Sequence, residues 1–302
     1  MFSIIVCHRN IDFLERFKLN VERTIGLPFE FVIIDNKKNQ YNIFQAYNEG
    51  IEKSQFEIIC FAHEDIFFET NNWGEIALSH FSDPNVGIIG VAGSHYLPKM
   101  PGAWWSTGIS SMNIKHQIGK EIKCEISKFF KTEKQYLSAI ILDGLWLCAR
   151  KSSINSIRFD DISYSGFHLY DSDICMQILK QGLDVRIVYD IAIIHFSQGC
   201  QDQKWVENSF IFYKKWKGSL PLLTQIISKE EKSNARYANA LEMIYVINRS
   251  NSPSKYLIKL LLTYISCIDF LYLEDSKKIL KFVFITIKSY CLRILNFNRL
   301  LH

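Results

Sequence analysis

Over residues 1–65, short apolar runs alternate with segments of helical periodicity. The apolar runs are rich in β-branched residues, which is typical of buried parallel strands. In the first helical segment, apolar residues recur at the spacing of one helix face and Gly26 ends the pattern. The strand-like runs are residues 3–7, 29–35 and 56–62, and the helical segments are residues 11–26 and 41–54. This order predicts an α/β fold with a doubly wound, mostly parallel sheet flanked by helices.

The same alternation continues less regularly to about residue 225. Two connecting segments stand out: an aromatic loop at residues 97–108 that contains Gly and Pro, and a polar stretch from Met112 to Gln135. The polar stretch predicts a hairpin or a mobile excursion. Helices are predicted at residues 73–81 and 171–181, and strands at residues 86–93, 184–189 and 191–196.

Beyond residue 225 the chain changes character. Residues 250–254 read SNSPS, which indicates a linker, and residues 255–302 are helical, basic and apolar. The most apolar stretch has 18 residues but contains Lys259 and Asp269, so it is too short and interrupted for a transmembrane helix. A packed helical hairpin and a helix that lies on a membrane surface both remain open. We predict a catalytic domain at 1–225 and a helical C-terminal region at 226–302.

Composition excludes some classes of protein. The 302 residues are 48% hydrophobic and 22% charged, which suits a sizeable core and excludes a disordered chain. The net charge of +4 allows weak attraction to an anionic surface, but no basic stripe suggests a nucleic-acid partner. The eight cysteines form no CxxC pair and the N-terminus lacks the pattern of a secretory signal, so we expect reduced thiols and a cytoplasmic protein.

Polar residues follow the first three predicted strands. They are His8-Arg9-Asn10, Asp35-Asn36 and His63-Glu64-Asp65. In a sheet of this kind ligands bind beyond the carboxyl ends of the strands, so we expect these three clusters to converge on one crevice.

The third cluster suggests a cation site. A divalent metal such as Mn²⁺ or Mg²⁺ neutralises charge on a departing diphosphate and prefers oxygen ligands, so Asp65 is the expected ligand. His63 points to the same side of an extended segment. His195 ends the strand IAIIH and is expected to be a third ligand. A solvated turn or helix cap for Asp65, and a core histidine for His195, are the alternatives.

A second acidic cluster lies at the start of the helix predicted at residues 171–181. Asp171 is the candidate general base that takes the proton of an acceptor hydroxyl, because a carboxylate at a helix N-terminus stays ionised. Asp173 is expected to contact the acceptor. Both carboxylates could instead be helix caps.

Other polar and aromatic residues are expected to contact the substrates. Asp35 and Asn36 are predicted to bind a uracil or ribose, and Arg9 to face the diphosphate. Trp104 and Trp105 lie in the loop at 97–108, where they would stack on an acceptor sugar or plug the loop.

In their order along the chain, these motifs resemble family 2-like glycosyltransferases of the GT-A (Rossmann-like) fold. In particular, they resemble a bacterial branch of that family with His-x-Asp in place of the usual Asp-x-Asp. The segments that carry the resemblance span residues 3–216 and include SIIVCHRN, VIIDN, CFAHEDIFF, LDGLWLCARKS, FHLYDSDICMQILKQG, IIHFSQG and FYKKW.

The resemblance implies a role for each matching position. His63 and Asp65 correspond to the metal and diphosphate motif, Asp171 to the catalytic base, and His195 to a further metal or diphosphate contact. Asp143 and Gly144 fall near the donor sugar and acceptor, and Asp35 falls near the nucleobase. The chain departs from the family pattern at His63, which replaces an aspartate, and at Tyr170, where an acidic residue is commoner.

These observations together predict an inverting, metal-dependent enzyme. It would move a sugar from a nucleotide-sugar, in particular a UDP-sugar, to a glycan or glycolipid acceptor such as a lipopolysaccharide or capsule precursor. The basic tail would make a peripheral contact with the inner face of the cell membrane. One alternative is a catalytically inactive protein on the same fold that binds a nucleotide-sugar or a glycan. A nucleotidyltransferase would need a Gly-rich phosphate loop after the first strand, which CHRNID lacks.

Overall fold

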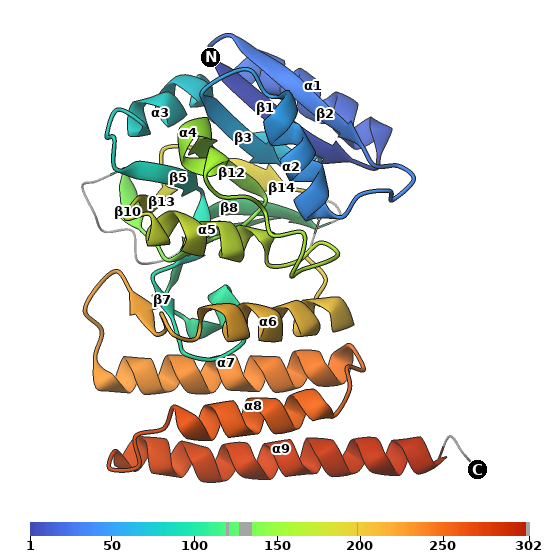
Figure 1. Ribbon diagram of the computed structural model, residues 1–302, viewed down its shortest axis with the longest axis vertical. Coiled ribbons are helices and arrows are strands. Elements are labelled where there is room, and N and C mark those ends of the chain that lie inside the picture. Colours follow the sequence, from blue (N-terminus) through green and yellow to red (C-terminus); the bar gives the residue numbers. More distant parts are fainter. Residues whose placement is uncertain (119–120, 127–134, 198, 300–302) are drawn as a thin grey trace. The chain divides into compact units, whose positions relative to one another are not determined.

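The computed structural model describes residues 1–118, 121–126, 135–197 and 199–299 (Figure 1). By its internal contacts the chain divides into two compact units. The sheet unit comprises Met1–His95 and Ser110–Gly199, and the helical unit comprises Tyr96–Ile109 and Cys200–His302. The predicted boundary at residue 225 is a division by function, between a catalytic domain and a C-terminal region, and it stays a prediction.

The sheet unit is built on a seven-stranded mixed sheet in the order β10-β13-β5-β12-β3-β1-β2. Strands β1, β2 and β3 are mutually parallel, whereas β12 runs antiparallel between β3 and β5. All five residues of β3 and of β5 are buried, because both faces of the sheet are covered. The strands are β1 Phe2–His8, β2 Phe29–Asp35, β3 Ile58–Ala62, β5 Val86–Gly90, β10 Tyr136–Ser138, β12 Trp146–Arg150 and β13 Asp184–Val188.

Two helices of the sheet unit, α1 and α2, begin at side chains that cap their first turn. The side chain of Asn10 accepts hydrogen bonds from the backbone of residues 12 and 13 and so starts α1, whose buried face includes Leu14, Phe17 and Val21. Asn42 and Gln45 form a capping box at the start of α2. The helices are α1 Ile11–Thr24, α2 Ile43–Lys53, α3 Trp73–His80, α4 Lys151–Asn155 and α5 Tyr170–Lys180.

A smaller sheet in the same unit has the order β11-β6-β8-β14-β4, and β9 pairs with β8. Strand β14 runs antiparallel to β4, which places His195 opposite Ile66. The hairpin of β8 and β9 confirms the hairpin predicted within 112–135, while residues 119–120 and 127–134 lie outside the described residues. The strands are β4 Ile66–Phe68, β6 Ala92–Ser94, β8 Ser110–Ile118, β9 Glu121–Ile126, β11 Ile141–Leu142 and β14 Ile193–His195.

The helical unit contains α6, α7, α8 and α9, which lie in successive layers (Figure 1). Tyr264 of α8 and Phe282 of α9 are both buried, with ring centroids 4.3 Å apart, so the C-terminal helices pack on one another. Among the described residues, no helix is long and apolar enough to span a bilayer. The elements are β7 Tyr96–Leu97, η1 Trp104–Thr107, α6 Gln203–Trp216, β15 Leu222–Leu223, α7 Lys229–Arg249, α8 Lys255–Ser266 and α9 Leu273–Arg299.

The predicted α/β fold class is confirmed. A mixed sheet is flanked by helices, and a C-terminal helical region follows it in the sequence. Each predicted helix before residue 182 is present to within two residues at either end. The loop at 97–108 contains a short strand and a 3₁₀ turn, and it belongs to the helical unit although it interrupts the sheet unit in sequence.

Candidate active site at the carboxyl edge of the sheet

One edge of the main sheet gathers most of the predicted site residues. The carboxyl ends of β1, β2 and β3 lie at this edge because the three strands are parallel. Strand β12 runs the other way and pairs Trp146 with Ala62, so the segment 143–145 that precedes it reaches the same edge. The backbone N–H of His63 donates to the carbonyl of Leu145 at 3.0 Å and joins the two segments.

His63, Asp65 and His195 form a compact cluster of potential metal ligands. One ligand atom from each side chain lies within 4.8 Å of those of the other two. The pairing of β14 with β4 places His195 beside the turn that contains Asp65. The backbone N–H of Phe196 donates to the carbonyl of Asp65 at 3.0 Å. Nε2 of His195 lies 3.5 Å from Oδ1 of Asp65. The structure therefore brings His195 close to His63 and Asp65, although His195 follows His63 by 132 positions in the sequence.

The protonation states of this cluster suit a cation. Burial alone raises the pKa of the Asp65 carboxyl, but the contact with His195 and the charges of both imidazoles together hold that pKa below its usual range. Burial lowers the pKa of His63 to about 4, against the opposing charge of Asp65. At neutral pH the cluster thus offers an ionised carboxylate and an imidazole with a lone pair. Divalent metals require ligands in those states, so the donor set fits such an ion.

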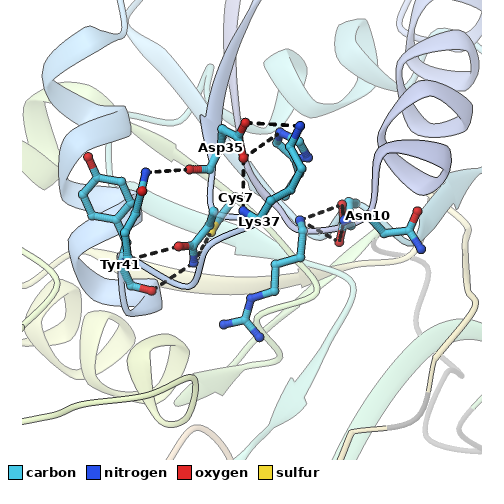
Figure 2. A network of polar contacts seen from close by, with 10 residues as sticks. Cys7, Asn10, Asp35, Lys37 and Tyr41 are labelled. Carbon is cyan, nitrogen blue, oxygen red and sulfur yellow. Dashed lines mark hydrogen bonds and ion pairs between the residues drawn. The ribbon is translucent and has the colours of Figure 1, made fainter.

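Glu64, between the two predicted ligands, has a structural role that the sequence did not indicate. Its carboxylate accepts hydrogen bonds of 3.1–3.2 Å from the backbone N–H groups of Arg9 and Asn10, drawn in Figure 2. Burial raises the pKa of Glu64, and these two bonds counteract it. Glu64 therefore fixes the end of β1 against the end of β3, and with it the backbone of Arg9.

The predicted nucleobase contacts belong to the same network of polar contacts, in which Figure 2 labels Asp35, Lys37 and Tyr41. Asp35 is exposed, forms an ion pair with Lys37 at 3.3 Å, and lies 3.7 Å from Nε2 of His8. A hydrogen bond from the backbone of Lys37 holds the pKa of Asp35 below its usual range. Asn36 is buried, and its amide bonds both the N–H and the C=O of Tyr41. Asn36 thus shapes the loop after β2, whereas the carboxylate of Asp35 remains accessible.

Asp171 lies at the first turn of α5, beside the segment that precedes β12. Its Oδ2 accepts a hydrogen bond of 3.0 Å from the backbone N–H of Gly144. Burial, reinforced by the negative charge of Asp143, raises the pKa of Asp171 to about 7. The carboxylate of Asp143 accepts the backbone N–H of Leu145 at 3.0 Å. The helix N-terminus therefore does not keep Asp171 fully ionised at neutral pH, contrary to the expectation from the sequence, but a carboxylate with a pKa near neutrality has the basicity that a general base requires.

Tyr170, next to Asp171, contacts both the cluster and the segment at 143–145. Its hydroxyl lies 2.8 Å from Nε2 of His63 and donates to the carbonyl of Gly144 at 2.9 Å. The approach requires glycine at position 144, because an added Cβ would lie 2.1 Å from the Tyr170 hydroxyl oxygen. Leu169, which precedes the helix, has a φ of 69°. A left-handed backbone at such a residue costs about 1–3 kcal/mol, and strain of this kind concentrates at functional sites.

Three further predicted residues, Asp173, Trp104 and Trp105, make other contacts in the structure. Asp173 is buried and accepts hydrogen bonds from Tyr164 at 3.0 Å and from Gln177 at 2.8 Å, so both of its carboxylate oxygens already have a donor within the protein. Trp104 and Trp105 belong to the helical unit, where their rings meet edge-on at 5.5 Å and Trp104 is buried. Contact of these three residues with an acceptor stays a prediction.

The chain is similar to known proteins in both sequence and structure. The family model described as "Glycosyltransferase like family" matches residues 3–217. The Streptomycin biosynthesis protein StrF of Streptomyces griseus is 25% identical over 134 residues, which make up 43% of this chain and only 44% of that protein. A crystal structure of GalNAc-T7 with UDP, GalNAc and Mn²⁺ has a TM-score of 0.49 and 10% identity, covering 82% of this chain and 56% of that chain. The family match includes every residue of the candidate site.

Replacement of Gly144 by alanine should destabilise the protein. The added methyl group would overlap the hydroxyl and ring of Tyr170, and overpacking of this kind costs about 1–3 kcal/mol. Chemical denaturation of Gly144→Ala should therefore show a lower midpoint than the wild type. Gly218→Ala is the matched control, because nothing lies within 4 Å of its added Cβ. Equal midpoints for the two variants would contradict the close approach of Tyr170 to Gly144.

Proposed function

Because the chain belongs to the Glycosyltransferase like family, we propose that it moves a sugar from a nucleotide-sugar to a hydroxyl of a glycan acceptor. The cluster of His63, Asp65 and His195 is the observation that carries this proposal, since it lies beside a carboxylate suited to be a base. The donor is a UDP-sugar and the acceptor is a lipopolysaccharide or capsule precursor. We assign the hexosyl class of transfer to the enzyme.

His63, Asp65 and His195 would hold the divalent cation. When bound, this ion neutralises the charge that develops on the leaving diphosphate. Two imidazole nitrogens and one carboxylate favour Mn²⁺ over Mg²⁺, which prefers an all-oxygen shell. Arg9, whose backbone Glu64 holds in place, supplies positive charge to the diphosphate from the end of β1.

Asp171 acts as the base of an inverting displacement. Its carboxylate takes the proton of the acceptor hydroxyl as that oxygen attacks the anomeric carbon from the face opposite the diphosphate. The hydrogen bond from Gly144 orients the carboxylate, and Asp143 keeps it basic through charge repulsion. Asp35 binds the nucleoside at the end of β2, where its carboxylate is exposed.

The C-terminal helix α9 provides a peripheral contact with the inner face of the membrane. Leu273, Leu280, Phe284 and Ile287 share one face of α9 and are all more than half exposed. Lys277, Lys281 and Lys288 lie on the same helix. Exposed apolar side chains interspersed with lysines are typical of helices that bind anionic lipid surfaces.

Asp65→Ala should abolish Mn²⁺-dependent binding of UDP, because the variant loses the anionic ligand of the cluster. Isothermal titration of UDP with and without Mn²⁺ measures this loss directly. Glu22→Ala, which removes an exposed carboxylate from α1, should bind as the wild type does. Unchanged binding by Asp65→Ala would remove Asp65 from the metal site.

Asp171→Asn should lower turnover by ~10²–10⁴ while UDP affinity stays the same, since the variant loses only the base. In the wild type, kcat/KM should fall as the pH decreases below about 7, because protonation of Asp171 inactivates the base. UDP release from a panel of UDP-sugars with Mn²⁺ would measure both effects. A flat profile from pH 5.5 to 8, or full activity of the variant, would assign the proton transfer to another group.

The double variant Leu280→Ser/Phe284→Ser should lose sedimentation with vesicles that contain phosphatidylglycerol. The two side chains are 74% and 69% exposed, so their replacement removes apolar surface without opening the core. Ile226→Ser changes a fully exposed apolar residue outside the helices and should sediment as the wild type does. If the double variant and the wild type sediment equally, α9 is not the membrane contact.

A further inference from the structure

The hydroxyl of Tyr170 joins a predicted metal ligand to the backbone beside the predicted base. It lies 2.8 Å from Nε2 of His63 and 2.9 Å from the carbonyl oxygen of Gly144. Tyr170 is buried, so water does not compete freely for either contact.

Counting protons assigns the direction of both hydrogen bonds. A tyrosine hydroxyl has one proton to donate, and a carbonyl oxygen can only accept. If Tyr170 donates to Gly144, its oxygen is left to accept from His63, so both contacts are hydrogen bonds. If Tyr170 donated to His63 instead, the buried carbonyl of Gly144 would lose this donor, which is unfavourable. The arrangement that satisfies both contacts places the proton of neutral His63 on Nε2.

We propose that Tyr170 is the positioning residue of the metal site: it holds His63 in the Nε2–H tautomer and leaves Nδ1 bare for the cation. Each ring nitrogen has a single in-plane direction, and that of Nε2 is taken by Tyr170. Nδ1 is then the atom of His63 that can join Asp65 and His195. This inference rests on the proposed metal-dependent function and adds which nitrogen binds and what selects it.

The surrounding structure keeps the Tyr170 hydroxyl in place. Aromatic rings surround the Tyr170 ring, and the glycine at 144 admits its hydroxyl to the backbone. The left-handed Leu169 sets where α5 begins and thus where Tyr170 enters the site. The rings with centroids 5.4–6.2 Å from that of Tyr170 include Phe44, Tyr47, Phe159 and Phe167.

The tautomer can be measured without any metal. In protein labelled with ¹⁵N at histidine, long-range ¹H–¹⁵N spectra at pH 7.5 distinguish a protonated from a bare ring nitrogen. The His63 signals are assigned by their loss in His63→Gln. The wild type should show His63 protonated at Nε2, and Tyr170→Phe should show a mixture of tautomers. Protonation of wild-type His63 at Nδ1 would overturn the inference whatever the protein does with metals.

A second experiment measures the affinity of the protein for Mn²⁺. The paramagnetic resonance of free Mn²⁺ is followed while Mn²⁺ alone is titrated with full-length protein. Tyr170→Phe should bind Mn²⁺ roughly 10–100-fold more weakly than the wild type, the usual effect of losing a partner that orients a ligand. Tyr164→Phe is the matched control: it removes a buried hydroxyl that bonds Asp173 from the same aromatic cluster and should leave Mn²⁺ affinity unchanged.

The outcomes separate this inference from the function on which it rests. Equal Mn²⁺ affinity for Tyr170→Phe and the wild type, with binding lost in Asp65→Ala, would overturn the role of Tyr170 and leave the metal site standing. Absence of Mn²⁺ binding by the wild type would overturn the metal site and the role of Tyr170 together.

Discussion

The candidate site depends on how one carboxylate is kept ionised away from water. The side chain of Asp65 is only 15% exposed, and a carboxylate in that position is unfavourable unless positive charge or hydrogen-bond donors compensate it. His195 contacts it at 3.5 Å and His63 lies within the same cluster, so its pKa stays low. Two nitrogen ligands around an ionised oxygen ligand form a site that a divalent cation would complete. The chemistry proposed for the enzyme follows from that arrangement.

Strand pairing completes this arrangement: His63 and Asp65 share the turn after β3, and the pairing of β14 with β4 brings His195 to them. The parallel strands β1 and β3 bring Glu64 to the end of β1, where it binds the backbone of Arg9 and Asn10. The antiparallel strand β12 then brings Gly144 to the same edge. Gly144 contacts both Asp171 and Tyr170, so the predicted base and the partner of His63 are held by one backbone segment. A change at Gly144 would therefore alter the surroundings of both side chains.

The sequence predicts the elements of this site better than the contacts between them. Hydrophobic periodicity identifies the first three strands, and the polar residues that follow them do lie at one edge, because parallel strands must end there. Periodicity could not indicate that Glu64 accepts hydrogen bonds from the backbone that follows β1, since those bonds depend on strand register. Nor could it indicate the contacts of Tyr170, which depend on the antiparallel course of β12. The residues at 97–108 join the helical unit through contacts that are distant in sequence.

A crystal of the full chain grown with UDP and Mn²⁺ would test the central claim most directly. Anomalous diffraction at the manganese edge locates the ion independently of the protein atoms. The account predicts a single strong peak bonded to a carboxylate oxygen of Asp65, to a ring nitrogen of His195 and to Nδ1 of His63, with the diphosphate on its open side. A peak elsewhere, or UDP bound with Asp65 turned away from it, would contradict the account.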